Sequence, residues 1–226
     1  AEENQMKQLG IIGLGAMGAP MAGKLQECGF QLFTTVRSAY SRQKAERMGI
    51  QVLETAGEIA ERTDRILLMV SNYEQCRGCL QGTDGVLAAM KKGIIIVSST
   101  IAPEQMRLLS EMCPEGIALL DAPVSGGVTG AEQGKLVTMA AGDSQVFEVC
   151  RIYFRPIPRR SFMWALSWDK ARCSRQSIKC WLESILQQQR RQCLSASLWG
   201  SIRRYCRIQS LNVQVILICS RVECPS

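Results

Sequence analysis

The 226-residue chain contains no histidine. Histidine is the commonest metal ligand, and structural zinc sites take their four ligands from cysteine and histidine. Cys76 and Cys79 form a CxxC pair, but no second pair and no histidine are present to complete the set. The sequence therefore predicts no metal site.

Long apolar runs are also missing. None approaches the roughly 18 uncharged apolar residues that cross a bilayer, and the opening residues AEENQMKQ lack the apolar segment of a secretory signal. The eleven cysteines are odd in number and irregularly spaced, which argues against a secreted disulfide scaffold. We expect a soluble, cytoplasmic protein without a membrane partner.

The last part of the chain, residues 155–226, has almost no glycine and few acidic side chains. It holds one of the 19 glycines, all four tryptophans and six of the eleven cysteines. Lys+Arg against Asp+Glu is 14 to 17 in residues 1–154 and 13 to 3 afterwards, so net charges of −3 and +10 sum to the formal +7. We predict a globular domain over 1–154 and a poorly ordered or loosely helical basic tail over 155–226.

The most informative segment is residues 9–25, LGIIGLGAMGAPMAGKL, in which an apolar run meets glycines and then a helix-periodic stretch. Gly13 permits a tight turn, Gly15 lets a pyrophosphate approach the backbone, and Gly18 lets the helix pack closely on the strand. The helix N-terminus then faces the phosphates. We predict a dinucleotide site here that also includes Leu14, Ala16 and Met17; the alternative is a glycine-rich loop without function.

Residues 30–36 read as a second strand. At the end of this strand an NAD enzyme usually places an Asp or Glu that binds the ribose hydroxyls, but here Arg37 and Ser38 follow. A guanidinium suits a 2'-phosphate that a carboxylate would repel, so the sequence favours NADP, with NAD possible. The alternative is that Arg37 is a solvated loop charge.

Further apolar runs occur at 65–70, 93–100 and 117–124, separated by helix-compatible stretches. This alternation predicts an α/β fold, a Rossmann-type, doubly wound and mostly parallel sheet. Ligands bind beyond the carboxyl ends of such strands, where we place Met69, Val70 and Thr100 as candidate cofactor contacts. Ser125, Gly126 and Gly127 offer a hydroxyl and unhindered amides that could bind a carboxylate, although a plain turn would use the same residues.

Three segments, GLGAMGAPMA (13–22), VSST (97–100) and DAPVSGGVTGAEQGKL (121–136), closely resemble the β-hydroxyacid dehydrogenase family, which includes the 3-hydroxyisobutyrate dehydrogenases. The resemblance covers about residues 8–154. It implies an NAD(P)-dependent oxidoreductase that interconverts a small hydroxy acid and its semialdehyde or keto form. It also implies that residues 13–18 and Val70 contact the cofactor, that Thr100 lies near the nicotinamide, and that residues 125–127 hold the substrate carboxylate.

The resemblance stops after Phe154. The family continues with a helix carrying GxxxKxxNQ, whose lysine is the general acid/base, and with an all-helical domain that closes the site and builds the homodimer. Neither Lys170 nor Lys179 lies in that context, so we assign no catalytic residue and expect neither turnover nor the normal homodimer.

A shift of reading frame explains the tail. When each third codon base is regrouped with the next two, residues 163–165 become a forced Val-Gly, Trp168-Asp169 a forced Gly, and Cys180-Trp181 a forced Leu. Allowed codon choices turn the intervening residues 169–179, DKARCSRQSIK, into QGxxxKxINQ, which contains the family motif. We therefore hypothesise a frameshift near Arg155.

Three function classes remain open from the sequence. The first is a family oxidoreductase, and the second is a dinucleotide-binding module without turnover. The third uses the tail's arginines and tryptophans to bind nucleic acid, but their spacing forms no recognisable motif, so we expect no nucleic-acid partner.

Overall fold

The computed structural model describes residues 7–154, 162–165 and 215–217. In chain order the elements are β1 (Gln8–Ile12), α2 (Gly18–Glu27), β2 (Gln31–Thr35), α3 (Ala39–Arg47), β3 (Gln51–Leu53), α4 (Ala56–Arg62), β4 (Arg65–Leu68), α5 (Tyr73–Leu80), α6 (Val86–Ala89), β5 (Gly93–Val97), α7 (Pro103–Glu111), β6 (Ile117–Asp121), β7 (Val124–Ser125), α8 (Gly127–Glu132), β8 (Val137–Ala141), α9 (Ser144–Cys150), the 3₁₀ helix η1 (Arg151–Phe154), β9 (Phe162–Ala165) and β10 (Val215–Leu217).

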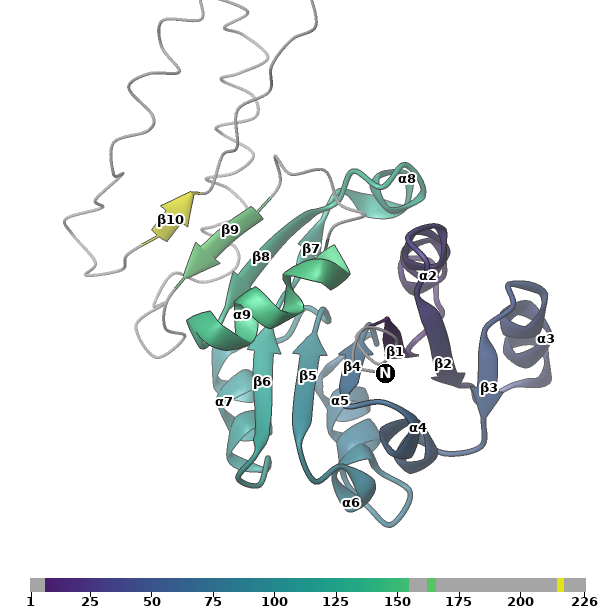
Figure 1. The fold of residues 1–226 in the computed structure, drawn as a ribbon, viewed down its shortest axis with the longest axis horizontal. Helices are drawn as coiled ribbons and strands as arrows, with labels where there is room; N and C mark the ends of the chain where they lie inside the picture. The colour runs from purple at the N-terminus through teal and green to yellow at the C-terminus, as the bar shows by residue number, and fades with distance from the viewer. Residues whose placement is uncertain (1–6, 155–161, 166–214, 218–226) are drawn as a thin grey trace, which may run out of the picture.

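One sheet runs through the molecule (Figure 1). Six strands lie in the order β3-β2-β1-β4-β5-β6 and all pair in parallel. The chain builds outward from β1 in one direction and then from β4 in the other, so the order reverses between these two strands. Such a reversal leaves a crevice at the carboxyl ends of the strands, where ligands bind in doubly wound sheets.

The sheet continues beyond β6 with strands of mixed direction. β8 pairs antiparallel with β6 and β7, while β9 lies parallel to β8 and β10 antiparallel to β9. The last two strands come from the tail, so its seven described residues extend the sheet. The rest of the predicted tail, with Lys170 and Lys179, lies outside the described residues.

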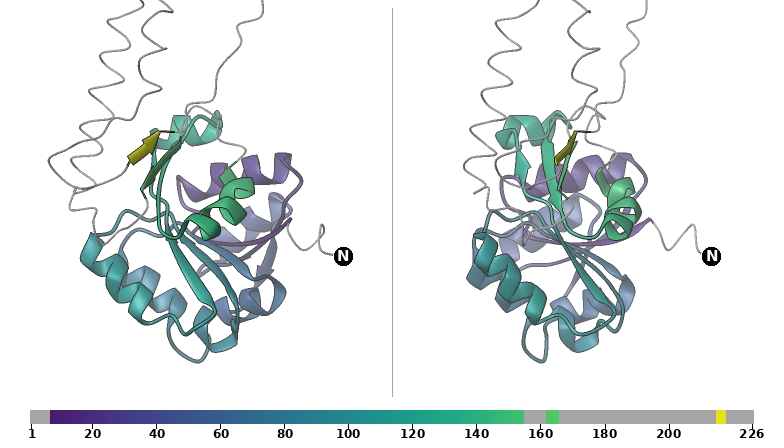
Figure 2. Two further views of the ribbon diagram at one scale, coloured as in Figure 1. Left: turned by 60° about the vertical axis from the view of Figure 1, so that its left-hand side comes forward. Right: turned by 90° about the vertical axis from the view of Figure 1, so that its left-hand side faces the viewer.

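The central strands are apolar on both faces because helices cover both faces. In β5, Ile94 and Ile96 belong to one core, whereas Ile95 and Val97 belong to the other. Helices α2 and α9 pack over the first core and α4, α5 and α7 over the second, an arrangement that can be followed in Figure 2. Alternate side chains of a strand point to opposite faces of the sheet, so a strand that is buried on both faces has an unbroken apolar sequence. The apolar runs predicted these strands for this reason.

The predicted fold class is confirmed, and each predicted apolar run contains a strand. The run at 117–124 divides into β6 and β7, which the sequence did not distinguish. Strands β3 and β8 were not predicted. Within the described residues, no helix combines the length and the apolar character needed to cross a membrane.

Candidate functional site

Most of the candidate residues lie just beyond the carboxyl ends of the parallel strands, and residues 125–127 lie at the end of the short antiparallel strand β7. Residues 13–18 follow β1, Arg37 and Ser38 follow β2, and Met69 and Val70 follow β4. Thr100 comes three residues after β5, and residues 125–127 lie beyond β6. The topology thus gathers segments that are up to about a hundred residues apart in sequence.

Two glycines of the first turn are required by the protein itself. Gly13 has φ +106°, and a Cβ there would lie 2.3 Å from the carbonyl oxygen of Met69. A Cβ on Gly18 would lie 1.8 Å from the carbonyl oxygen of Gly13. Because both approaches involve backbone atoms, no side chain could turn aside, and these glycines let α2 start directly against β1 and the β4 end.

Gly15 is different, because nothing in the described structure lies within 4 Å of the place where its Cβ would be. Its φ is also outside the left-handed region, so neither packing nor backbone geometry demands glycine. The residue is exposed at the crevice. Its lack of a side chain therefore fits a ligand that approaches the backbone closely.

The N-terminus of α2 lies beside Gly15. Met17 occupies the N-cap position without a side-chain cap, and the first turn carries no acidic residue. By contrast, Ser38, Thr55 and Asn72 accept hydrogen bonds from N–H groups of α3, α4 and α5. The N–H of Ala19 donates to the carbonyl oxygen of Gly15 at 3.1 Å, and Pro20 has no N–H. The positive end of the α2 dipole, without a side-chain cap or an acidic residue, still lies at this turn and suits an anion such as a pyrophosphate.

The ends of β4 and β5 are joined by a serine. The N–H of Val70 donates to Ser99 Oγ at 2.9 Å, and Ser99 Oγ in turn donates to the carbonyl oxygen of Leu68 at 3.4 Å. Ser99 is 1 % exposed, whereas its neighbour Thr100 is exposed toward solvent. Ser99 therefore fixes the strand end that carries Val70, and Thr100 presents its side chain at the same edge.

Arg37 and Ser38 have distinct local roles after β2. Ser38 Oγ accepts the N–H of Ser41 at 3.1 Å and so caps α3. Arg37 is exposed and makes no ion pair with an acidic side chain among the residues that the structure describes. Burial raises the pKa of the Cys79 thiol, and the positive charge of nearby Arg37 partly offsets this effect.

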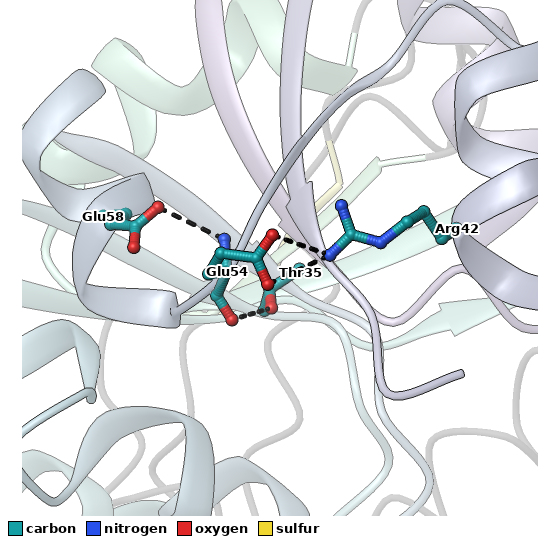
Figure 3. Close-up of polar contacts among 4 residues, drawn as sticks. All are labelled: Thr35, Arg42, Glu54 and Glu58. Atoms are coloured by element: carbon teal, nitrogen blue, oxygen red, sulfur yellow. Dashed lines mark hydrogen bonds and ion pairs between the residues drawn. The ribbon is translucent and has the colours of Figure 1, made fainter. Parts of the chain in front are cut away.

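A second group at this end was missed by the sequence analysis (Figure 3). Arg42 Nη2 donates to both carboxylate oxygens of Glu54, at 3.0 and 3.1 Å. Thr35, the last residue of β2, donates its hydroxyl to the carbonyl oxygen of Glu54 at 3.1 Å, and the Glu54 N–H donates to Glu58. The pattern of Thr55 followed by Glu58 could have indicated the start of α4, but not the ion pair.

Residues 125–127 form the turn from β7 into α8. Gly126 has φ +132° and Gly127 φ +63°, which are left-handed conformations that favour glycine. Ser125 is half-buried, both glycines are exposed, and α8 packs against α2. The structure therefore brings the predicted carboxylate-binding turn next to the helix of the glycine loop, as seen in Figure 1.

The described part of the chain contains no group of three or more His, Cys, Asp or Glu side chains that could hold a metal. None of its five cysteines forms a disulfide within the described residues, and three of them lie in the core. Burial raises the pKa of the Cys113 thiol to about 11 and that of Cys150 to about 12. These two thiols therefore stay protonated near neutral pH and are not poised as nucleophiles.

Taken together, a parallel sheet with this strand order, a turn with Gly13, Gly15 and Gly18, and a free helix N-terminus define the class of Rossmann-type, NAD(P)-binding domains. Residues 8–165 match the family described as the NAD binding domain of 6-phosphogluconate dehydrogenase. The chain belongs to this family. Its N-terminal two thirds are also similar to β-hydroxyacid dehydrogenases of the 3-hydroxyisobutyrate dehydrogenase type.

Individual relatives agree with this assignment. The chain is 37% identical over 161 residues to an NAD-dependent L-serine dehydrogenase of Pseudomonas aeruginosa, covering 70% of this chain and 53% of the relative. It is 41% identical over 143 residues to the 2-hydroxy-3-oxopropionate reductase of Escherichia coli, covering 62% and 49%.

Among solved structures, Mycobacterium tuberculosis 3-hydroxyisobutyrate dehydrogenase with L-serine is similar at a TM-score of 0.63. It is 32% identical, over 67% of this chain and 52% of that one. The chain thus spans about half the length of the relatives it matches.

Proposed function

We propose that residues 8–154 bind a nicotinamide dinucleotide, with its pyrophosphate over Gly15 and the N-terminus of α2. The observation that carries this proposal is the open space at Gly15, a position where neither packing nor backbone conformation accounts for glycine. The N-terminal end of α2, which has no side-chain cap and no acidic residue in its first turn, would face the phosphate oxygens with the positive end of its dipole. Val70, held by Ser99, and the exposed Thr100 would line the path toward the nicotinamide.

NADP is the favoured form in this proposal, with NAD as the weaker ligand. Arg37 is exposed beyond β2, where the ribose 2'-position would lie, and among the described residues no carboxylate neutralises it. Its guanidinium could pair with two phosphate oxygens. Ser38 already caps α3, so we assign it the lesser part of donating its hydroxyl at the same place.

The reaction proposed for the complete family enzyme interconverts a small hydroxy acid and its semialdehyde or keto form. The bound nicotinamide would supply or accept the hydride. Ser125 and the amides of Gly126 and Gly127 would hold the substrate carboxylate, because the left-handed backbone of this turn leaves the amides unhindered.

We propose that this particular chain binds the cofactor without turnover. The 226 residues contain no GxxxKxxNQ motif, so they lack the proton donor and acceptor that the family resemblance requires. Proton transfer of that kind contributes about 10²- to 10⁴-fold to a rate. Residues 13–18 would still bind the dinucleotide, because their contacts are mostly backbone groups within one βαβ unit.

A titration of the full chain with NADPH and NADH, followed by an assay of threonate and of 3-hydroxyisobutyrate with NADP+ or NAD+ as the hydride acceptor, tests both parts. We expect saturable binding of NADPH, weaker binding of NADH, and no change in nicotinamide absorbance with either hydroxy acid. Absence of binding would refute the cofactor site, whereas turnover would refute only the claim about the missing lysine.

We also propose that residues 155–226 are encoded in a shifted frame, which is why they lack the lysine motif. The support is the compositional break and the three forced regroupings at 163–165, 168–169 and 180–181. Determining the transcript and genomic sequence around the codons for Tyr153 to Pro156 tests it. A single-base regrouping that opens a frame containing GxxxKxxNQ supports the proposal. A transcript and a genome that both encode residues 155–226 in the same frame as the preceding residues, with no such alternative frame, overturn it.

A further inference from the structure

The ion pair between Arg42 and Glu54 lies at the strand end where the proposed cofactor would place its adenosine ribose. Glu54 follows β3 directly, and its carbonyl oxygen accepts the hydroxyl of Thr35, the last residue of β2. Arg42 is in the first turn of α3, and its N–H donates to the carbonyl oxygen of Ser38 at 3.0 Å. The pair therefore joins α3, which follows Arg37, to the end of β3, which lies beside the end of β2 that precedes Arg37.

The geometry of this pair holds both partners in place. Both carboxylate oxygens of Glu54 accept from Nη2 of Arg42, and the Glu54 backbone is fixed on one side by Thr35 and on the other by Glu58 (Figure 3). The Glu54 side chain is 73% exposed and that of Arg42 36% exposed. A ligand arriving beyond β2 would meet this pair without any rearrangement of the core.

The charges around this strand end are unequal. Arg37 has no acidic partner among the described residues, whereas Arg42 is neutralised by Glu54. Without Glu54, two guanidinium groups would face a 2'-phosphate of charge near −2. With Glu54 in place, the guanidinium of Arg42 is ion-paired and the negative charge of the Glu54 carboxylate lies in the same region. Glu54 therefore opposes a 2'-phosphate at this end, and the carboxylate of Glu58, which accepts the N–H of Glu54 at 3.2 Å, lies beside it.

We propose that the Arg42–Glu54 pair sets how strongly the chain distinguishes NADP from NAD, with Glu54 limiting the preference that Arg37 creates. The inference rests on the proposed dinucleotide function and concerns a specificity-determining pair within that site. Glu54 acts by repelling the 2'-phosphate and by holding Arg42 away from it. NAD lacks that phosphate and is nearly indifferent to the pair.

The size of the effect follows from charge and distance. Glu54 accepts the hydroxyl of Thr35, and Arg37 lies two residues further along the chain, within about 7 Å. We take about 6–10 Å as the separation between the pair and a 2'-phosphate bound at Arg37. At the water-like dielectric of an exposed site, removing one charge at that distance changes the NADPH affinity by about three- to tenfold. The effect should shrink as salt rises, because the Debye length is about 8 Å at physiological ionic strength.

Equilibrium titration of the full chain with NADPH and with NADH tests the proposal in four variants. We expect E54Q to raise the ratio of NADPH to NADH affinity by about three- to tenfold and R42Q to lower it by a similar factor. The double variant R42Q/E54Q should return to within about twofold of the unaltered ratio, because the net charge at the strand end is again that of the intact pair.

The matched control is E111Q, which breaks the exposed Arg107–Glu111 pair on α7, against β6 and away from β2. It should leave the ratio unchanged. An unaltered ratio in both E54Q and R42Q, with NADPH and NADH still bound, would overturn this inference alone. If the unaltered chain binds neither nucleotide, the proposed function fails and the inference fails with it.

Discussion

At the scale of single residues, Gly13, Gly15 and Gly18 are glycines for three different reasons. Gly13 needs its left-handed backbone, and Gly18 needs the absence of a Cβ against a backbone carbonyl. Gly15 needs neither, and we propose that a bound ligand accounts for it. Two of the three glycines of the motif are therefore required by the fold, and we assign the third to binding.

Gly18→Ala should unfold the domain more easily. The added Cβ would lie 1.8 Å from the Gly13 carbonyl oxygen, so strand and helix must move apart, and we expect a loss of at least about 2 kcal/mol in the free energy of unfolding. Urea denaturation measures this loss.

Gly23→Ala, in the same helix and with nothing within 4 Å of its Cβ position, is the control. It should stabilise the domain by about 0.5–1 kcal/mol, since alanine is the better helix former. Equal stabilities for the two variants would show that α2 does not pack on β1 as described.

At the scale of elements, the sequence was most informative where burial was complete. Residues 93–97 are buried throughout, so their apolar run was sufficient to predict β5 from the sequence. β3, with the residues QVL, is short and partly exposed, and nothing in its pattern separated it from a loop. A strand buried on both faces has a continuous apolar run that the sequence reveals, and an edge strand lacks this run.

The Arg42–Glu54 pair could not be predicted for a different reason. Its partners come from α3 and the end of β3, and their meeting depends on how those elements cross. No spacing along the chain encodes it. The place of Arg37, by contrast, could be predicted, because the residue follows directly from the carboxyl end of β2 along the chain.

Helix α9 provides a pH-dependent test of the packing. Burial raises the pKa of Cys150 to about 12 from the usual value of 9.0, and Cys150 is fully buried. Below pH 9 the thiol is protonated in both the folded and the unfolded state, so its contribution to stability is complete. Between pH 9 and 12 only the unfolded state ionises, and stability falls by up to about 1.4 kcal/mol per pH unit.

Denaturation curves at pH 8 to 10.5 should therefore show a shallower loss of stability for Cys150→Ala than for the unaltered chain. The exposed Cys28→Ala is the control and should follow the unaltered chain. If Cys150→Ala and the unaltered chain lose stability in parallel, the thiol is not shielded by α9 and the sheet.

At the scale of the whole molecule, we assign cofactor binding to the described domain and no catalytic step to the chain. The described domain carries every residue to which we assign a cofactor contact, whereas the catalytic lysine motif is missing from the sequence. The chain also spans about half the length of its relatives. Because residues 155–226 do not resemble the family's helical domain and their arginines and tryptophans form no recognisable nucleic-acid motif, we propose that the chain does not build the family's homodimer in the normal way and has no nucleic-acid partner.

Restoring the shifted frame from about Arg155 should convert a binding chain into an enzyme. We expect the re-read chain to contain GxxxKxxNQ and to reduce NADP with a small hydroxy acid, while the unaltered chain does not. A lysine-to-alanine change within the restored motif is the matched control and should abolish turnover but keep NADPH binding. A re-read chain that folds, binds NADPH and stays inactive on both hydroxy acids would count against the frameshift.

The central claim is that the glycine turn binds a dinucleotide, and NADPH titration of Gly15→Val beside the unaltered chain tests it most directly. Gly15 has open space around it, so the variant should keep the stability of the unaltered domain. We predict at least about a tenfold loss of NADPH affinity, because the valine side chain occupies the place of the pyrophosphate. Unchanged NADPH affinity in a folded Gly15→Val chain, or no binding by the unaltered chain, would contradict the account.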